Sequence, residues 1–181
     1  MKRPILKKTS GIAMILLMST LTAISQNAYT KLCLDAISFE KEGRLDEAAE
    51  KYSEAIRLKP DEWTGYKYRA KVNLERGLYD DVIADATRAL DLSPDETSLY
   101  EIRARGFHAK NMPDRAIDDF NKARPGPGSK EKGSFMTYYH RGRAYFSNKQ
   151  YRDAIFDFDV AASSSPGHWN SEPDIYIYRA Q

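Results

Sequence analysis

The chain has 181 residues, enough for about one domain, of which 41% are apolar and 30% carry a charge. Its formal net charge is +2, and basic residues cluster only among the first eight, so the composition does not indicate nucleic-acid binding. The single cysteine, Cys33, excludes an intrachain disulfide and a cysteine-based metal cluster.

Residues 1–25 differ in character from the rest of the chain. The first eight, MKRPILKK, are basic, residues 11–24 carry no charge, and Ala23 and Ser25 place small residues at the end. This order is typical of a secretory signal peptide, and the uncharged run is shorter than the roughly 20 residues of a membrane-spanning helix. We therefore expect residues 1–25 to be a cleaved signal and residues 26–181 to be exported, to the periplasm or the medium, with no membrane contact afterwards. A membrane anchor is the alternative.

The remaining sequence repeats with a period near 34 residues, and the fourth and fifth copies each begin 38 residues after the copy before. Each copy has two amphipathic runs, which are separated at Gly43 and Gly77 in the first two copies and closed by Pro60 and Pro94. Self-similarity at this period is typical of a helical solenoid. The copies span residues 29–62, 63–96, 97–130 and 135–168, with a partial fifth copy at 173–181.

Small residues recur at positions 8, 20 and 27 of each copy, and large apolar residues recur at positions 4, 11 and 24. In the first copy the small residues are Ala36, Ala48 and Ala55. Small residues at fixed places allow neighbouring helices to approach closely. The pattern resembles the tetratricopeptide repeat family, and the resemblance implies an all-α, right-handed α-solenoid of helix-turn-helix units.

Two departures from this pattern are local. The second copy has Asn73 and Ala86 at positions that are otherwise large, for which we expect local repacking. In the third copy Pro125 ends the second helix, and the Gly- and Pro-rich residues 125–134 are expected to form a loop.

Charge at positions 7 and 23 inverts together between copies. The first copy has Asp35 and Lys51, whereas the later copies have arginine at position 7 and aspartate at position 23. We interpret this as ion pairing within each helix pair, and we expect exposed pairs that fix register and contribute only about 0–1 kcal/mol. The expected pairs are Asp35–Lys51, Arg69–Asp85, Arg103–Asp119 and Arg141–Asp157.

No catalytic motif is present in the sequence. The three histidines, His108, His140 and His168, do not form a zinc motif, and there is no phosphate-binding glycine loop or nucleophile elbow. We therefore expect a protein that is not an enzyme and that has no cofactor and no metal.

The resemblance implies that the first helix of each unit lines a groove for a partner. Position 9 is basic in three consecutive copies, as Lys71, Arg105 and Arg143, with aromatic residues nearby, which suits an acidic, partly apolar protein or peptide. The family's clamp for chaperone tails is excluded by Cys33 and Ile37 in the first copy. The candidate binding residues are Lys67, Tyr68, Lys71, Ile102, Arg105, Tyr139, His140, Arg143 and Tyr178.

These expectations favour an exported, non-catalytic interaction module or assembly scaffold that does not bind nucleic acid. The alternative is an accessory domain of a larger enzyme or envelope complex.

Overall fold

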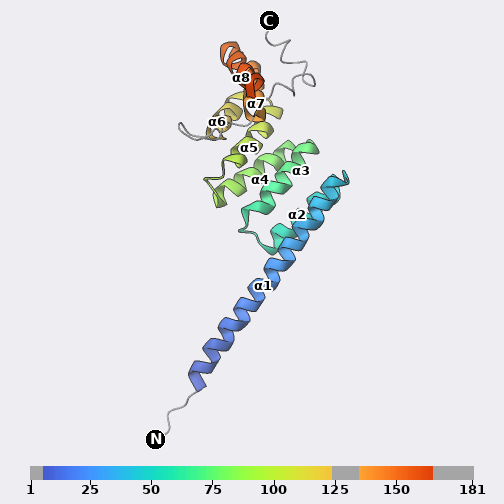
Figure 1. The fold of residues 1–181 in the computed structure, drawn as a ribbon, viewed down its shortest axis with the longest axis vertical. Coiled ribbons are helices and arrows are strands. Elements are labelled where there is room, and N and C mark those ends of the chain that lie inside the picture. Colours follow the sequence, from blue (N-terminus) through green and yellow to red (C-terminus); the bar gives the residue numbers. More distant parts are fainter. Residues whose placement is uncertain (1–5, 124–134, 165–181) are drawn as a thin grey trace. The chain divides into compact units, whose positions relative to one another are not determined.

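The computed structural model describes residues 6–123 and 135–164, and every regular element in these ranges is an α-helix (Figure 1). The predicted all-α fold is therefore confirmed. The helices are α1 (Leu6–Lys41), α2 (Leu45–Leu58), α3 (Trp63–Glu75), α4 (Tyr79–Leu92), α5 (Thr97–Ala109), α6 (Pro113–Ala123), α7 (Phe135–Ser147) and α8 (Tyr151–Ser164).

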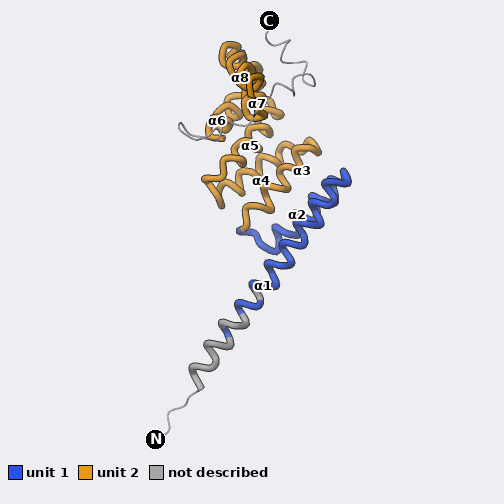
Figure 2. Tube along the Cα trace, in the orientation of Figure 1, with its two compact units in different colours: residues 1–61 blue, residues 62–181 orange. Residues whose placement is uncertain are grey.

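The chain forms two compact units, residues 1–61 and 62–181 (Figure 2). In the first unit α1 packs against α2, and Tyr29, Ala36 and Tyr52 are buried. The hydroxyl of Tyr52 donates a hydrogen bond to the Glu40 carboxylate, which ties the two helices together.

Helix α1 has 36 residues and continues without a break through residue 25, where the sequence predicts the end of a signal peptide. No helix in the described parts of the chain combines the length and the apolar character needed to cross a membrane.

The second unit contains three helix pairs, α3–α4, α5–α6 and α7–α8 (Figure 1). The second helix of one pair packs against the first helix of the next, so α4 contacts α5 and α6 contacts α7. The first helices also touch in series, α3 with α5 and α5 with α7. The pairs begin at Trp63, Thr97 and Phe135, the residues that start the second, third and fourth sequence copies.

The turn within each helix pair has the same backbone conformation. Position 15 of the copies, occupied by Gly43, Gly77, Asn111 and Lys149, has a φ angle between 57° and 75°. The residue that follows donates a backbone hydrogen bond to the carbonyl five residues earlier, as from Leu78 to Asn73 at 2.9 Å. This is the Schellman arrangement, in which a left-handed residue ends the helix and satisfies its last carbonyls.

The small and large positions of the repeat meet in the core. Ala104 and Ala116 are fully buried together with Phe120, and Gly142 lies against Phe158 in the last pair. A Cβ atom added at Gly142 would lie 2.7 Å from the Phe158 ring, which explains glycine at this position. Around the second copy, where Asn73 and Ala86 replace large residues, the core is mainly aliphatic, as the expected repacking requires.

Three of the four predicted ion pairs form, each with two hydrogen bonds between guanidinium and carboxylate. The Arg69 Nε and Nη2 atoms lie 2.8 and 2.6 Å from the Asp85 oxygens, and the Arg103–Asp119 distances are 2.7 and 3.0 Å. In the pair of Arg141 and Asp157 they are 2.6 and 2.7 Å. These hydrogen bonds raise the pKa of Arg69 and of Arg103.

The prediction of a fourth pair, Asp35 with Lys51, is wrong, because these two residues form no ion pair in the structure. The Lys51 ammonium donates to Glu54 at 2.9 Å, and Asp35 contributes only a weaker electrostatic attraction. Glu54 lies three residues further along the same helix, so a flexible lysine reaches it more easily than a carboxylate on the other helix.

The expectation that these pairs are exposed is also wrong. The Asp85, Asp119 and Asp157 side chains are only 7%, 4% and 1% exposed, and Arg141 is 6% exposed. Carboxylates buried to this extent need their partners, because a buried charge without one is strongly unfavourable. The pairs therefore belong to the core.

Two of the arginines also connect successive repeats. Arg103 donates to the Thr87 hydroxyl on α4 at 3.2 Å, and Arg141 donates to Asn121 on α6 at 2.8 Å. Both guanidinium groups lie near aromatic rings at positions 4 and 11 of their own helix, 5.5 Å from Tyr138 in the case of Arg141. Each of these arginines thus links its own helix pair to the preceding one.

We expect Asp157→Ala to lower the free energy of unfolding by about 3–5 kcal/mol, because it leaves the buried Arg141 guanidinium without its counter-charge. Urea denaturation would measure this loss. The matched control is Asp80→Ala, which removes an exposed pair with Lys110 (2.8 Å, with Asp80 81% exposed) and should cost about 0–1 kcal/mol. Equal losses in the two variants would contradict a core role for Asp157.

Candidate functional site

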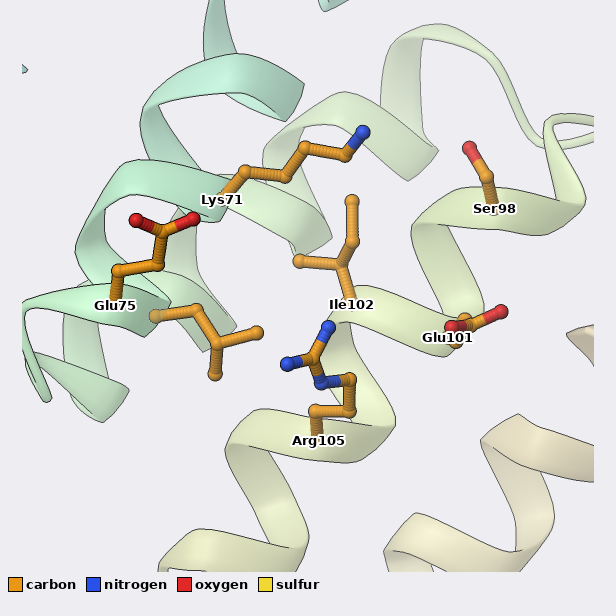
Figure 3. Close-up of a pocket in the computed structure, with 7 residues that line it drawn as sticks. Lys71, Glu75, Ser98, Glu101, Ile102 and Arg105 are labelled. Atoms are coloured by element: carbon orange, nitrogen blue, oxygen red, sulfur yellow. The ribbon is translucent and has the colours of Figure 1, made fainter. Parts of the chain in front are cut away.

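The first helices of the second unit, α3, α5 and α7, border two clefts. The first cleft lies between α3 and α5 and has a volume of about 400 Å³ (Figure 3). Its lining residues are Lys71, Leu74 and Glu75 of α3 and Ser98, Glu101, Ile102 and Arg105 of α5.

Charge in the first cleft is mixed. Figure 3 shows the Arg105 and Ile102 side chains directed towards α3, whereas Glu101 points away from Lys71 and Glu75. Glu101 accepts a hydrogen bond of 2.7 Å from the Thr137 hydroxyl on α7. Two cations and two carboxylates therefore share this cleft, with apolar contact from Leu74 and Ile102.

The second cleft, of about 360 Å³, extends from α3 to α7 and shares Leu74 and Arg105 with the first. Two arginines, Arg105 and Arg143, and two histidines contribute to it, and none of the described residues that line it is acidic. Its lining residues are Leu74, Tyr79, Arg105, His108, Ala109, Phe120, His140 and Arg143.

The cations at position 9 differ from the arginines at position 7 in having no counter-charge. Within the described residues, Lys71, Arg105 and Arg143 form no ion pair. Two residues along a helix rotate a side chain by about 200°, so position 9 faces away from the core when position 7 faces into it. Lys71 lies 5.7 Å from the Tyr68 ring and Arg143 lies 5.8 Å from the Tyr139 ring.

His140 lies in the second cleft with its Nε2 atom buried, and that atom has no hydrogen-bond partner among the described residues. The pKa of His140 is lowered to about 3, mainly by burial and also by the positive charges of Arg105 and Arg143, with a smaller effect from His108. The ring is therefore neutral at physiological pH.

His108, in contrast, is held by α7. Its Nε2 atom lies 3.2 Å from the Ser147 hydroxyl, and the Arg143 backbone also contacts the ring. Burial lowers the pKa of His108, as does the charge of Arg143. His108 therefore fixes the spacing between α5 and α7.

The structure brings together five of the predicted site residues. Three of the others are engaged elsewhere: Lys67 pairs with Glu96 at 3.2 Å, Tyr68 lies beneath Lys71, and Tyr139 is 3% exposed in the core of the last helix pair. Tyr178 lies outside the described residues. The five residues that line the two clefts are Lys71, Ile102, Arg105, His140 and Arg143.

Sequence reasoning missed several lining residues. Leu74 and His108 each occupy position 12 of their copy, which is a groove position in the family pattern and could have been included. Tyr79 and Phe120 come from second helices, and no sequence signal places them at the cleft.

The clefts offer no set of metal ligands. Across residues 6–123 and 135–164, no three His, Cys, Asp or Glu side chains are grouped so that they could hold a metal ion. The second cleft, which two arginines and no described acidic residue line, is suited to binding an anion by charge and hydrogen bonding.

We expect acid to destabilise the fold through His140. Its folded-state pKa of about 3 lies below the unfolded value of about 6.5, so unfolding takes up a proton and stability falls as the pH drops below about 6.5. Between pH 6.5 and 5 this one group should cost about 2 kcal/mol.

Urea denaturation of the native protein and of His140→Leu at pH 7 and pH 5 would measure this difference. The leucine variant should lose less stability over the interval, because it has no proton to take up. The same pH dependence in both proteins would contradict the neutral, buried state of His140.

Comparison with known proteins supports the repeat assignment. Two family models described as tetratricopeptide repeat match residues 34–97 and 137–168. A sequence search of curated proteins gave no match.

Several solved structures share the fold at low sequence identity. MamA residues 41-end from Desulfovibrio magneticus RS-1 has a TM-score of 0.73 at 13% identity, over 84% of each chain. Another MamA structure has a TM-score of 0.65 at 20% identity, over 92% of this chain and 90% of that one. PilW, a type IV pilus biogenesis factor, has a TM-score of 0.67 at 15% identity, over 76% of this chain and 62% of its own.

The two family matches together span more than half of the chain, and the helix pairs repeat with the matching period. The chain is therefore a tetratricopeptide-repeat protein, an α-solenoid of helix pairs.

Proposed function

We propose that the chain is an exported, non-catalytic interaction module whose α3–α5–α7 face binds an acidic, partly apolar peptide or protein segment. The observation that carries this proposal is the row of cations at position 9, Lys71, Arg105 and Arg143, for which the described part of the chain provides no ion-pair partner. The arginines at position 7 show that this fold can pair a cation internally, whereas the cations at position 9 form no ion pair with any residue that the structure describes.

The fold supports a role in protein interaction or assembly. Repeat solenoids present extended surfaces along which a partner segment can lie, because each repeat adds an equivalent helix to the same face. Here α3, α5 and α7 contact one another in series, so the clefts they border form one continuous region.

The partner's chemistry follows from the lining of the clefts. Leu74 and Ile102 offer apolar contact, and the cations beside them favour carboxylates. Because Glu75 also borders the first cleft, a segment with uniform negative charge would fit less well than one that alternates acidic and apolar residues.

Binding can be tested by selecting twelve-residue peptides from a random display library on the immobilised protein. We expect the selected peptides to combine Asp or Glu with apolar residues. Lys71→Glu combined with Arg105→Glu should weaken their binding about tenfold or more, because two attractive charges become repulsive.

The matched control reverses two exposed cations on second helices, Arg57→Glu combined with Arg152→Glu, and should leave binding nearly unchanged. Selection of neutral or basic peptides, or equal binding by both double variants, would move the site away from this face.

Export is the second part of the proposal, and it is supported by the basic start and the short uncharged run of residues 1–25. Intact mass spectrometry of the protein recovered outside the cytoplasm of the producing cell should give a chain that begins near Gln26. The cytoplasmic fraction of the same cells provides the full-length control. A full-length chain recovered with the membrane would instead support an anchor.

The alternative function is an accessory domain of a larger enzyme or envelope complex. PilW, which shares the fold, is described as a pilus biogenesis factor, and this assembly role is the observation that favours the alternative. Obligate co-purification of the chain with an enzyme from its host would support it over an independent module.

A further inference from the structure

We propose that the second cleft, which extends from α3 to α7, is the subsite that anchors a carboxylate of the bound peptide. In this arrangement Arg105 and Arg143 supply the opposite charge and the His140 Nε2 atom donates a hydrogen bond. The inference rests on the proposed function and specifies which part of the face holds the acidic group.

The charges at the two clefts differ in the way that this assignment requires. Lys71 and Arg105 share the first cleft with two carboxylates, whereas the described residues that line the second include two arginines and no acid. The guanidinium groups of Arg105 and Arg143 come from successive repeats, so an anion between them would contact both repeats. The planar fork of a guanidinium matches a carboxylate, to which it can donate two parallel hydrogen bonds.

His140 supplies an observation that charge alone does not. A buried polar atom without a hydrogen-bond partner is rare and unfavourable, and across residues 6–123 and 135–164 the Nε2 atom of His140 has no such partner. A neutral imidazole has one N–H donor and one acceptor nitrogen. A carboxylate in the cleft would accept the hydrogen bond that Nε2–H lacks in the free protein.

The other groups around His140 create a suitable environment. The other ionisable residues that line the cleft are Arg105 and His108 of α5, Arg143 of α7 and Tyr79 of α4. Leu74 and Phe120 add apolar walls. An apolar surrounding lowers the local dielectric constant and so strengthens attraction between the arginines and an anion.

The competing explanation is that His140 is a packing residue and that both arginines are simply solvated. The two explanations differ in how stability and affinity respond to substitution. Replacement of His140 by leucine removes a polar atom that has no partner, so it should preserve the fold under either explanation. Only if His140 anchors a carboxylate should the same substitution also weaken the affinity for acidic peptides.

The experiment uses the full protein and defined probes. The main probe is a twelve-residue peptide of repeated Glu-Tyr-Ser with blocked ends. One control is the Gln-Tyr-Ser peptide with blocked ends, which has no carboxylate. The other is the same glutamine peptide with a free carboxyl end, which distinguishes binding of a chain end from binding of side-chain carboxylates. Calorimetry at pH 7 would measure affinity, and thermal unfolding would measure stability.

We expect His140→Leu to keep or raise the unfolding temperature while it weakens binding of the glutamate peptide about tenfold. His140→Gln retains an N–H donor and should bind within about threefold of the native protein. Arg143→Gln should also weaken binding about tenfold, whereas Arg152→Gln, the same change on the exposed surface of α8, should have no effect.

The outcomes separate this inference from the function on which it rests. If the native protein binds the glutamate peptide and both His140→Leu and Arg143→Gln bind it with the same affinity, the subsite is overturned and the proposed function is left intact. If the native protein binds neither this peptide nor the free-ended peptide, both the subsite and the proposed function are overturned. If His140→Leu fails to fold, His140 is a structural residue and the donor role is wrong, and Arg143→Gln then decides whether the cleft binds the carboxylate.

Discussion

The buried arginine–aspartate pairs are the constraint on which the second unit depends. Each arginine makes two hydrogen bonds to an aspartate in its own helix pair, and Arg103 and Arg141 also reach a polar side chain on the preceding pair. A buried charge is tolerated only with a well-placed partner, so only a narrow range of helix arrangements satisfies all these groups at once. Apolar packing alone would be less selective, because a core tolerates many apolar substitutions of similar volume.

The pairing of the arginines at position 7 with buried aspartates leaves the cations at position 9 as the positive charges on the α3–α5–α7 face. Positions 7 and 9 lie on the same helix but face in roughly opposite directions, so the inner arginine is neutralised by the core and the outer cation is not. The face of α3, α5 and α7 therefore acquires its charge without unpaired charge in the interior. A substitution at position 9 would therefore alter the charge of this face while the core remained unchanged.

The fold could be predicted from the sequence, because packing imposes a regular pattern. The contact geometry of helix pairs requires small residues at positions 8, 20 and 27 and large residues between them. The charges at positions 7 and 23 are inverted together in the first copy, which indicated that the two positions pair. The exception was Lys51, which pairs with Glu54 because a long side chain has several carboxylates within reach. The burial of the aspartates was also missed, because a charged residue in a sequence gives no direct measure of its exposure.

The site was less predictable, because a cleft depends on residues from several helices. Lys71, Arg105 and Arg143 line the clefts because one helix periodicity places position 9 of each copy on the same side. Tyr139 satisfied the same family pattern, yet it packs into the core against Phe158. The unpaired nitrogen of His140 follows only from the combined placement of α5 and α7 around it. A group that costs stability in the free protein and has its complement in an acidic ligand is expected at a binding site, where function and stability make opposite demands.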